Sequence, residues 1–180
     1  MKLLISIFMF AAMATCTSQT EKSGTATATA TSDATAKPDT IPFPVYLSFD
    51  DFRHHLEKSN DTTYVVNFWA TWCAPCVHEL PYFEKLRTEM HDQPVQVLLV
   101  SMDFPKDIEK KLIPFVAKRN LEDAVVALAD LDYNSWIDQV STQWDGAIPF
   151  TVVYNSKSRQ VKLGELSSYR ELEKFVREMM

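Results

Sequence analysis

Two cysteines, separated by two residues, stand where an apolar segment gives way to a helical pattern. Cys73 and Cys76 follow the run 64–69, whose β-branched and aromatic residues predict a buried strand. Residues 77–86, which come next, have the pattern of a helix. Cys73 would then lie at a helix N-terminus, where unpaired N–H groups and the helix dipole stabilise a thiolate. This arrangement suits reversible disulfide exchange.

Tryptophans flank the pair and make the motif distinctive. The segment reads Phe68-Trp69-Ala70-Thr71-Trp72-Cys73-Ala74-Pro75-Cys76 and is followed by Glu79-Leu80-Pro81. It resembles the thioredoxin superfamily, and in particular its TlpA/ResA-like membrane-anchored thiol–disulfide oxidoreductases. The resemblance extends from Pro44 to the C-terminus and includes a second motif, Gly146-Ala147-Ile148-Pro149.

Strand-like and helix-like segments alternate through the folded part, which we expect to span 41–180. Strands are predicted at 45–47, 64–69, 95–102, 124–129, 150–154 and 161–166. Helices are predicted from Ser48 or Asp50 to Lys58, from Val77 to Leu86, from Asp107 to Asn120 with a bend or break at Pro114, from Leu131 to Val140, and after a cap at Ser167. This order predicts an α/β sandwich with a mixed sheet. The resemblance implies a thioredoxin-like fold, a central mixed sheet flanked by helices, with a TlpA-type helical insertion at 102–145.

The two cysteines are expected to differ in role. Cys73 precedes the helix proper and is the candidate nucleophile, while Cys76, one turn inside, would resolve the mixed disulfide. We expect no cofactor beyond the redox-active Cys73–Cys76 disulfide. Two alternatives are a zinc half-site and a purely structural bridge. A closed zinc site needs four ligands and only His78 stands nearby, so we predict no metal. A purely structural disulfide is disfavoured because the short loop between the cysteines would restrict little of the unfolded chain.

Glu79 is the candidate acid/base residue. It follows Cys76 by three residues and so lies on the same face of a helix. The resemblance implies that it handles the proton of Cys76, provided that burial raises its pKa toward neutrality. The alternative is a solvated helix residue. Asn67 stands where thioredoxin has a buried aspartate, and an amide cannot transfer a proton, so Glu79 is the more plausible acid/base group.

Three further residues are expected to bind the substrate. Trp72, beside the nucleophile, would shape the surface where a partner docks. The resemblance implies that Ile148 and Pro149 form a cis-proline element beside the cysteines, with the Ile148 backbone binding an extended substrate segment. The alternative for Pro149 is an ordinary trans proline before a strand.

The first forty residues have the pattern of an exported lipoprotein. Residues 1–15 resemble a lipoprotein-type signal peptide, with Lys2 before an apolar stretch too short to span a bilayer. Cys16 falls where a lipidated cysteine would stand, although the preceding residues match a lipobox imperfectly. Ordinary cleavage or a cysteine without a role are the alternatives. Residues 16–40 are rich in Thr, Ala and Ser and predict a disordered tether.

These observations predict an exported, lipid-anchored thiol–disulfide oxidoreductase. The resemblance to TlpA/ResA-like proteins implies that it reduces disulfides in target proteins, as in cytochrome c maturation. We expect a periplasm-facing location in a bacterial cell envelope, a membrane thiol electron donor and a monomeric state. A general oxidant or isomerase and a metal-delivery or redox-sensing module are alternatives; a peroxidase would need its cysteine in a different motif. A net charge of −6 and the lack of a basic stripe argue against nucleic acid as a partner.

Overall fold

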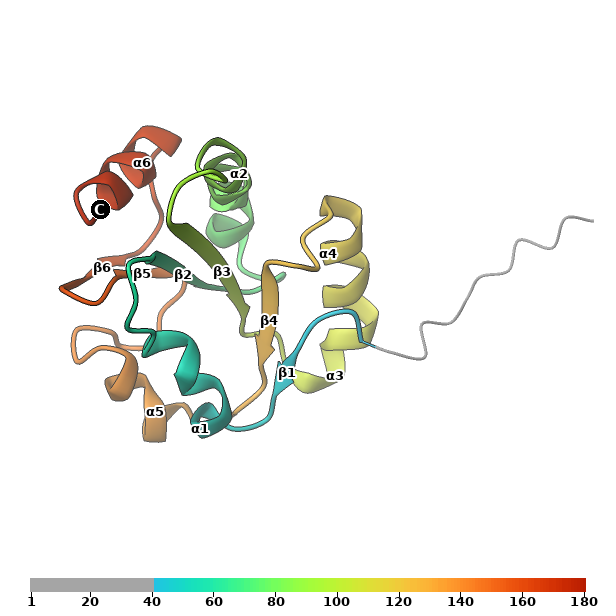
Figure 1. The fold of residues 1–180 in the computed structure, drawn as a ribbon. Coiled ribbons are helices and arrows are strands. Elements are labelled where there is room, and N and C mark those ends of the chain that lie inside the picture. The colour runs from blue at the N-terminus through green and yellow to red at the C-terminus, as the bar shows by residue number, and fades with distance from the viewer. Residues whose placement is uncertain (1–40) are drawn as a thin grey trace, which may run out of the picture. The chain divides into compact units, whose positions relative to one another are not determined.

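The computed structural model describes residues 41–180. The expected signal peptide 1–15, the expected lipidation site Cys16 and the expected tether 16–40 therefore lie outside the described residues. Within 41–180 the elements form the predicted α/β fold around one sheet (Figure 1).

The sheet is mixed and has six strands in the order β1-β4-β3-β2-β5-β6. In chain order the strands are β1 Val45–Tyr46, β2 Thr63–Trp69, β3 Val95–Ser101, β4 Val125–Leu128, β5 Phe150–Tyr154 and β6 Arg159–Leu163. β2 pairs in parallel with β3, from Thr63 opposite Val95 to Trp69 opposite Ser101. On its other side β2 pairs antiparallel with β5. β2 is therefore central, and the sheet positions the loop at its carboxyl end, which carries the cysteines.

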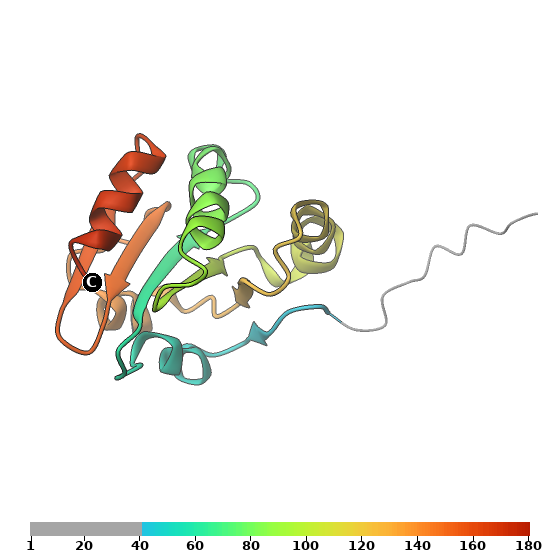
Figure 2. The ribbon, with the colours of Figure 1, turned by 45° about the horizontal axis from the view of Figure 1, so that its top comes forward.

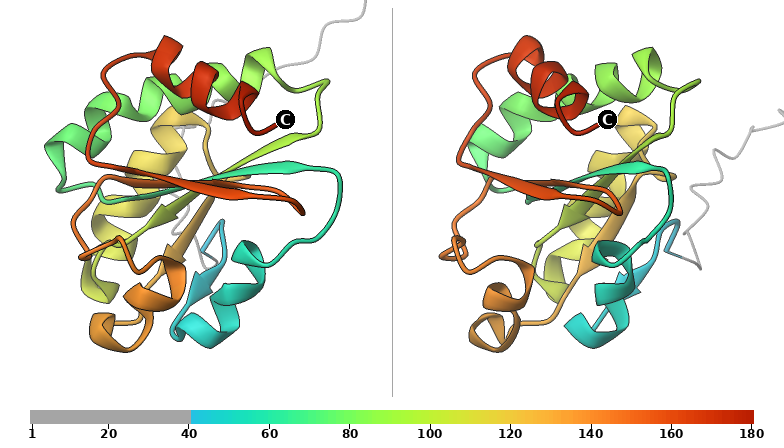
Figure 3. Two further views of the ribbon diagram at one scale, coloured as in Figure 1. Left: turned by 90° about the vertical axis from the view of Figure 1, so that its left-hand side faces the viewer. Right: turned by 60° about the vertical axis from the view of Figure 1, so that its left-hand side comes forward.

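Helices cover both faces of the sheet (Figure 3). They are α1 Phe49–Phe52, the 3₁₀ turn η1 Arg53–Leu56, α2 Ala74–Glu89, α3 Pro105–Asp107, the π-helical turn η2 Ile108–Leu112, α4 Ile113–Arg119, α5 Tyr133–Val140 and α6 Tyr169–Arg177. α2 and α6 lie side by side (Figure 2), and they share one apolar cluster with η2 and α4. α1, η1 and α5 pack in a second cluster.

Alternate residues of β2 enter the two clusters. Val65 and Trp69 pack with α2, whereas Val66 and Phe68 pack with α1 and α5. All four are fully buried. A strand that is buried on both faces has a nearly continuous apolar sequence, which is why this segment was recognisable as a core strand.

The expected interruption of the helix 107–120 near Pro114 is present. The chain forms α3, η2 and α4 in succession. Pro114 lies in the first turn of α4 and has no N–H to donate to the preceding turn, so the regular α-helical ladder is interrupted before it. The expected insertion 102–145 contains these helices and also β4 and α5.

Several predicted boundaries need correction. The helix predicted from Val77 to Leu86 runs from Ala74 to Glu89 as α2. The first helix ends at Leu56 as a 3₁₀ turn and does not reach Lys58. β6 ends at Leu163, because Gly164 follows with a left-handed φ of 72° and turns the chain away. Ser168, and not Ser167, caps α6.

The hydrogen bonds of Ser167 and Ser168 show which of the two serines caps α6. The Ser168 hydroxyl accepts a hydrogen bond from the Glu171 N–H at 3.3 Å. Ser167 acts as a donor instead: its N–H and its hydroxyl both donate to Oε2 of Glu171, each at 2.7 Å. The two serines thus bind opposite groups of one glutamate, in the manner of a capping box.

Candidate active site

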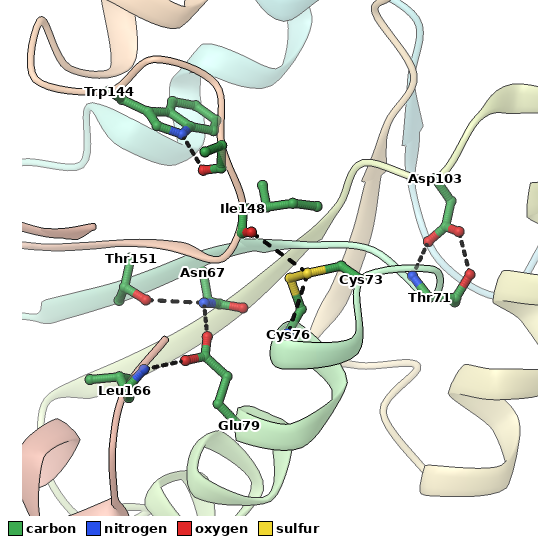
Figure 4. The surroundings of a disulfide bond; sticks show 11 residues. Asn67, Thr71, Cys73, Cys76, Glu79, Asp103, Trp144, Ile148, Thr151 and Leu166 are labelled. Carbon is green, nitrogen blue, oxygen red and sulfur yellow. Dashed lines mark hydrogen bonds between the residues drawn. A yellow bond between two sulfur atoms is a disulfide. The ribbon is translucent and has the colours of Figure 1, made fainter. Parts of the chain in front are cut away.

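Cys73 and Cys76 form a disulfide at the start of α2 (Figure 4). Their Cα atoms lie 5.3 Å apart. Cys73 is the N-cap of the helix, and its sulfur accepts the N–H of Cys76 at 3.3 Å. The expected location of the first sulfur at a helix N-terminus is confirmed. One of the unpaired amides of this terminus is directed at that sulfur, which is the position where a thiolate is stabilised.

The two sulfurs are unequally accessible. Cys73 keeps 6% of its surface exposed, whereas Cys76 has none. Cys73 is therefore the residue that an incoming sulfur could reach. This order agrees with the expected roles of nucleophile and resolving thiol, and those roles stay predictions.

The Ile148–Pro149 peptide bond is cis and lies beside the pair. The carbonyl oxygen of Ile148 is 3.7 Å from the sulfur of Cys73. The expected cis-proline element is thus present next to the cysteines. Binding of an extended substrate segment by the Ile148 backbone stays a prediction.

Trp72 projects beside the pair with 53% of its surface exposed. Its ring stacks on that of Phe104, with 6.1 Å between centroids and 17° between planes. A cavity of about 170 Å³ is lined by Trp72, Met102, Phe104, Tyr133, Gly146 and Ile148. Gly146 adopts a φ of 90°, and a Cβ there would lie 2.8 Å from Ile137 Cδ1, so this wall requires glycine. The expected docking surface at Trp72 therefore includes a small apolar hollow.

Glu79 is fully buried one turn after Cys76. Its Oε1 accepts a hydrogen bond from Asn67 Nδ2 at 2.9 Å, and its Oε2 accepts the Leu166 N–H at 2.7 Å. Burial raises the pKa of Glu79 to about 7, against the opposing effect of these two hydrogen bonds. The solvated alternative is wrong, because the side chain lies between β2, α2 and the connection from β6 to α6.

Asn67 joins Glu79 to the sheet. Its Nδ2 also donates to Thr151 Oγ1, on β5, at 3.0 Å, and all three side chains are buried. Its Oδ1 has no hydrogen-bond partner among residues 41–180. Sequence reasoning treated Asn67 only as the loss of an acid and missed Thr151. The signal was available, since two polar residues in otherwise apolar central strands are expected to hydrogen-bond.

A second buried carboxylate, also missed from the sequence, anchors the loop before Cys73. Asp103 is 1% exposed, and its Oδ2 accepts the Thr71 N–H at 2.9 Å and the Ser101 hydroxyl at 2.8 Å. Its Oδ1 accepts the Thr71 hydroxyl. This clamp ties the loop to the end of β3 (Figure 4). Its position directly after a buried strand was the usable signal.

His78 pairs with a carboxylate. Its Nδ1 lies 2.5 Å from Oε1 of Glu165 on the exposed side of α2. Across residues 41–180, His, Cys, Asp and Glu side chains form no group of three or more that could hold a metal ion. In the same part of the chain, no helix combines the length and apolarity needed to cross a bilayer.

The fold and this site define a thioredoxin-like protein with a cysteine pair at the start of α2. The chain belongs to the AhpC/TSA family, which matches residues 49–162. It is 35% identical over 78 residues to the thiol-disulfide oxidoreductase ResA of Geobacillus thermodenitrificans strain NG80-2. That match covers 43% of the chain and 45% of the relative, so the chain spans less than half the length of this curated relative.

Two solved structures share the fold. The thioredoxin-related protein from Neisseria meningitidis serogroup B aligns with a TM-score of 0.55 and 23% identity, over 68% of the chain and 86% of that protein. A DsbF homologue from Corynebacterium diphtheriae aligns with a TM-score of 0.52 and 21% identity, over 67% of the chain and 73% of that protein. At these identities the likeness supports the thioredoxin-like fold alone.

Glu79 should make the free energy of unfolding depend on pH. Its folded pKa of about 7 lies above the ordinary 4.5, so the folded chain retains a proton that the unfolded chain has lost. The stabilisation from Glu79 is complete below about pH 4.5 and is lost as the pH rises through about 7, a difference on the order of 3 kcal/mol. Urea unfolding of the oxidised chain at about pH 5 and about pH 8, compared with Glu79→Gln, measures this contribution. If the free energy of unfolding fell equally between the two pH values in the wild-type chain and in Glu79→Gln, this prediction would be contradicted.

Proposed function

We propose that the protein is a thiol–disulfide oxidoreductase acting on other proteins. The observation that carries this proposal is the Cys73–Cys76 disulfide at the start of α2, with only Cys73 reaching the surface and the cis-Pro149 loop beside it. The similarity to ResA over 78 residues supports the same activity. The exposed Trp72 and the hollow next to it supply a surface on which a partner segment could rest.

In the dithiol form, the thiolate of Cys73 attacks one sulfur of a target disulfide. The target bond breaks, its second sulfur leaves as a thiolate and takes a proton from solvent, and a mixed disulfide joins Cys73 to the target. Glu79 then accepts the proton of Cys76, and the Cys76 thiolate attacks the sulfur of Cys73. The Cys73–Cys76 bond forms, the mixed disulfide breaks, and the target leaves with both sulfurs reduced. Two electrons have passed from the chain to the target.

We propose that this reducing direction is the physiological one, with protein disulfides such as those of apocytochrome c as targets. A thiol donor in the membrane would then return the chain to the dithiol form. We propose a monomer as the working unit, since each step uses residues of one chain.

We also propose that the protein is exported and lipid-anchored at Cys16, facing the periplasm of a bacterial cell envelope. The support is the sequence of residues 1–40, with its signal-like start and its polar, Thr- and Ala-rich continuation. A flexible chain of about 25 residues spans on the order of 25–30 Å, which would hold the domain clear of the lipid surface.

The cysteine assignment is tested by insulin reduction with dithiothreitol. The full chain should accelerate the reaction, and Cys73→Ser should reduce the rate to that of dithiothreitol alone, because the attacking sulfur is lost. Cys76→Ser should accumulate a mixed disulfide that a reductant releases, because the resolving thiol is lost. Cys16→Ser, a matched change at the remaining cysteine, should retain full activity. Equal activity of Cys73→Ser and the unmodified chain would rule out this assignment.

The role of Glu79 is tested by the pH dependence of mixed-disulfide resolution. The rate should rise with pH around the Glu79 pKa of about 7, since the ionised carboxylate accepts the Cys76 proton. Glu79→Gln should remove this step and slow resolution on the order of 10²-fold at neutral pH. Rapid-mixing measurements on a preformed mixed disulfide give both values. An unchanged profile in Glu79→Gln would remove Glu79 from the mechanism.

The anchor is tested by fractionation of cells that express the full chain. The protein should sediment with membranes, and Cys16→Ser should move it to the soluble fraction, because the acyl chains have no other attachment. Cys73→Ser, as the matched cysteine change, should stay with the membranes. Membrane retention of Cys16→Ser would overturn the proposed anchor.

A further inference from the structure

Asn67 lies in the layer between the central strand and the helix that carries the cysteines. Side chains of a strand alternate between its faces, so Asn67 shares a face with Val65 and Trp69. Those two residues pack in the same cluster as Cys73 and Cys76. Asn67 is fully buried there. Its amide is therefore enclosed by Glu79, Thr151 and the layer that holds the sulfurs.

The hydrogen bonds of this amide are incomplete in a specific way. Both N–H groups of Nδ2 are used, one by Glu79 Oε1 and one by Thr151 Oγ1. The carbonyl Oδ1 has no donor within residues 41–180. In Figure 4 it points away from Glu79 and Thr151, on the side where the disulfide is drawn. A buried carbonyl without a donor is unfavourable, so a donor that appears in another state of the site would be bound.

Reduction creates such a donor. The disulfide carries no proton, whereas the Cys76 thiol has an S–H and lies one helical turn from Glu79. We propose that Asn67 is a positioning residue whose amide turns over as one proton passes between Cys76 and Glu79. This inference rests on the proposed function, because it describes how the resolving thiol gives up its proton.

Two arrangements satisfy every group. With Glu79 ionised and Cys76 a thiol, Nδ2 donates to the carboxylate and Oδ1 accepts the S–H. With Glu79 protonated and Cys76 a thiolate, the inverted amide donates Nδ2–H to the sulfur, and Oδ1 accepts the carboxyl O–H. The Thr151 hydroxyl serves both, because it can accept from Nδ2 or donate to Oδ1. The nitrogen and oxygen of an amide are nearly equal in size, so a half-turn exchanges them without displacing neighbours.

The same geometry disfavours two anions at once. A single NH₂ group cannot donate to the carboxylate and to the thiolate from one orientation, so the amide limits the pair to one negative charge. The other ionisable groups near Glu79 are engaged with partners of their own. Lys162 on β6 pairs with Glu171 at 3.0 Å, and Glu165, which follows β6, pairs with His78 at 2.5 Å. The proton thus leaves Cys76 as the thiolate is stabilised, and no net charge enters the layer.

Nuclear magnetic resonance of the isotope-labelled full chain tests the inversion directly. In the oxidised chain, protonation of Glu79 should invert the amide, because Oδ1 then gains the carboxyl proton. Lowering the pH from about 9 to about 5 should replace the contact between the Asn67 NH₂ protons and Glu79 with a contact to the Cys76 methylene, at the midpoint of the Glu79 carboxyl titration. Glu79→Gln should abolish this pH response. NH₂ contacts that stay the same across the Glu79 titration would overturn the proposal.

Kinetics provide a second test. Asn67→Leu should slow the resolution of a mixed disulfide about tenfold and move the midpoint of its pH dependence upward, because the carboxylate loses a donor. Thr151→Val is the matched control: it removes one hydrogen bond from either amide orientation, so the midpoint should stay in place. An unmoved midpoint in Asn67→Leu would contradict the proposal. The magnetic resonance test needs no turnover. A wild-type chain without oxidoreductase activity would refute the proposed function, whereas the NH₂ contacts of Asn67 alone decide whether the amide inverts.

Discussion

The site depends on a carboxylate that is held without solvent contact. Glu79 is fully buried, yet both of its oxygens have donors: one from a strand side chain and one from a backbone amide after β6. An unpaired charge in such a place would be strongly disfavoured. The two donors favour the ionised carboxylate, whereas burial favours the neutral acid and raises the pKa. The carboxylate therefore joins α2, β2 and the β6–α6 connection, which are far apart in the sequence.

The cysteine pair is held from the opposite side by a different carboxylate. Asp103 fixes Thr71, two residues before Cys73, to the end of β3. Its neighbour Phe104 stacks on Trp72. One dipeptide thus anchors the loop internally and supports its exposed tryptophan. The surface that would meet a partner is therefore connected to the buried sheet by direct contacts. Its position is set by the residues that follow the end of β3.

Much of this arrangement was predictable from local sequence. The run 64–69, the pair Cys73 and Cys76 and the Ile148–Pro149 element each carry a signal within a few residues. The contacts of Glu79 do not, because Leu166 contributes only a backbone N–H, which any residue except proline would offer. Asp103 follows a buried strand, but the local sequence does not identify Thr71 as its partner. Ser167 and Ser168 are chemically identical, so only the backbone decides which one caps α6.

The buried carboxyl group of Glu79 is unfavourable for folding, and its raised pKa indicates a functional reason for its presence. Burial disfavours the charged form of an acid and costs free energy, which hydrogen bonds offset only in part. Here the acid lies one turn from Cys76 and titrates near neutrality, where proton transfer to and from a thiol is most effective. The hydrogen bonds from Asn67 and Leu166 keep that pKa from rising further. A fold optimised for stability would have no reason to keep this balance, whereas a site that must give and take one proton in each cycle depends on it.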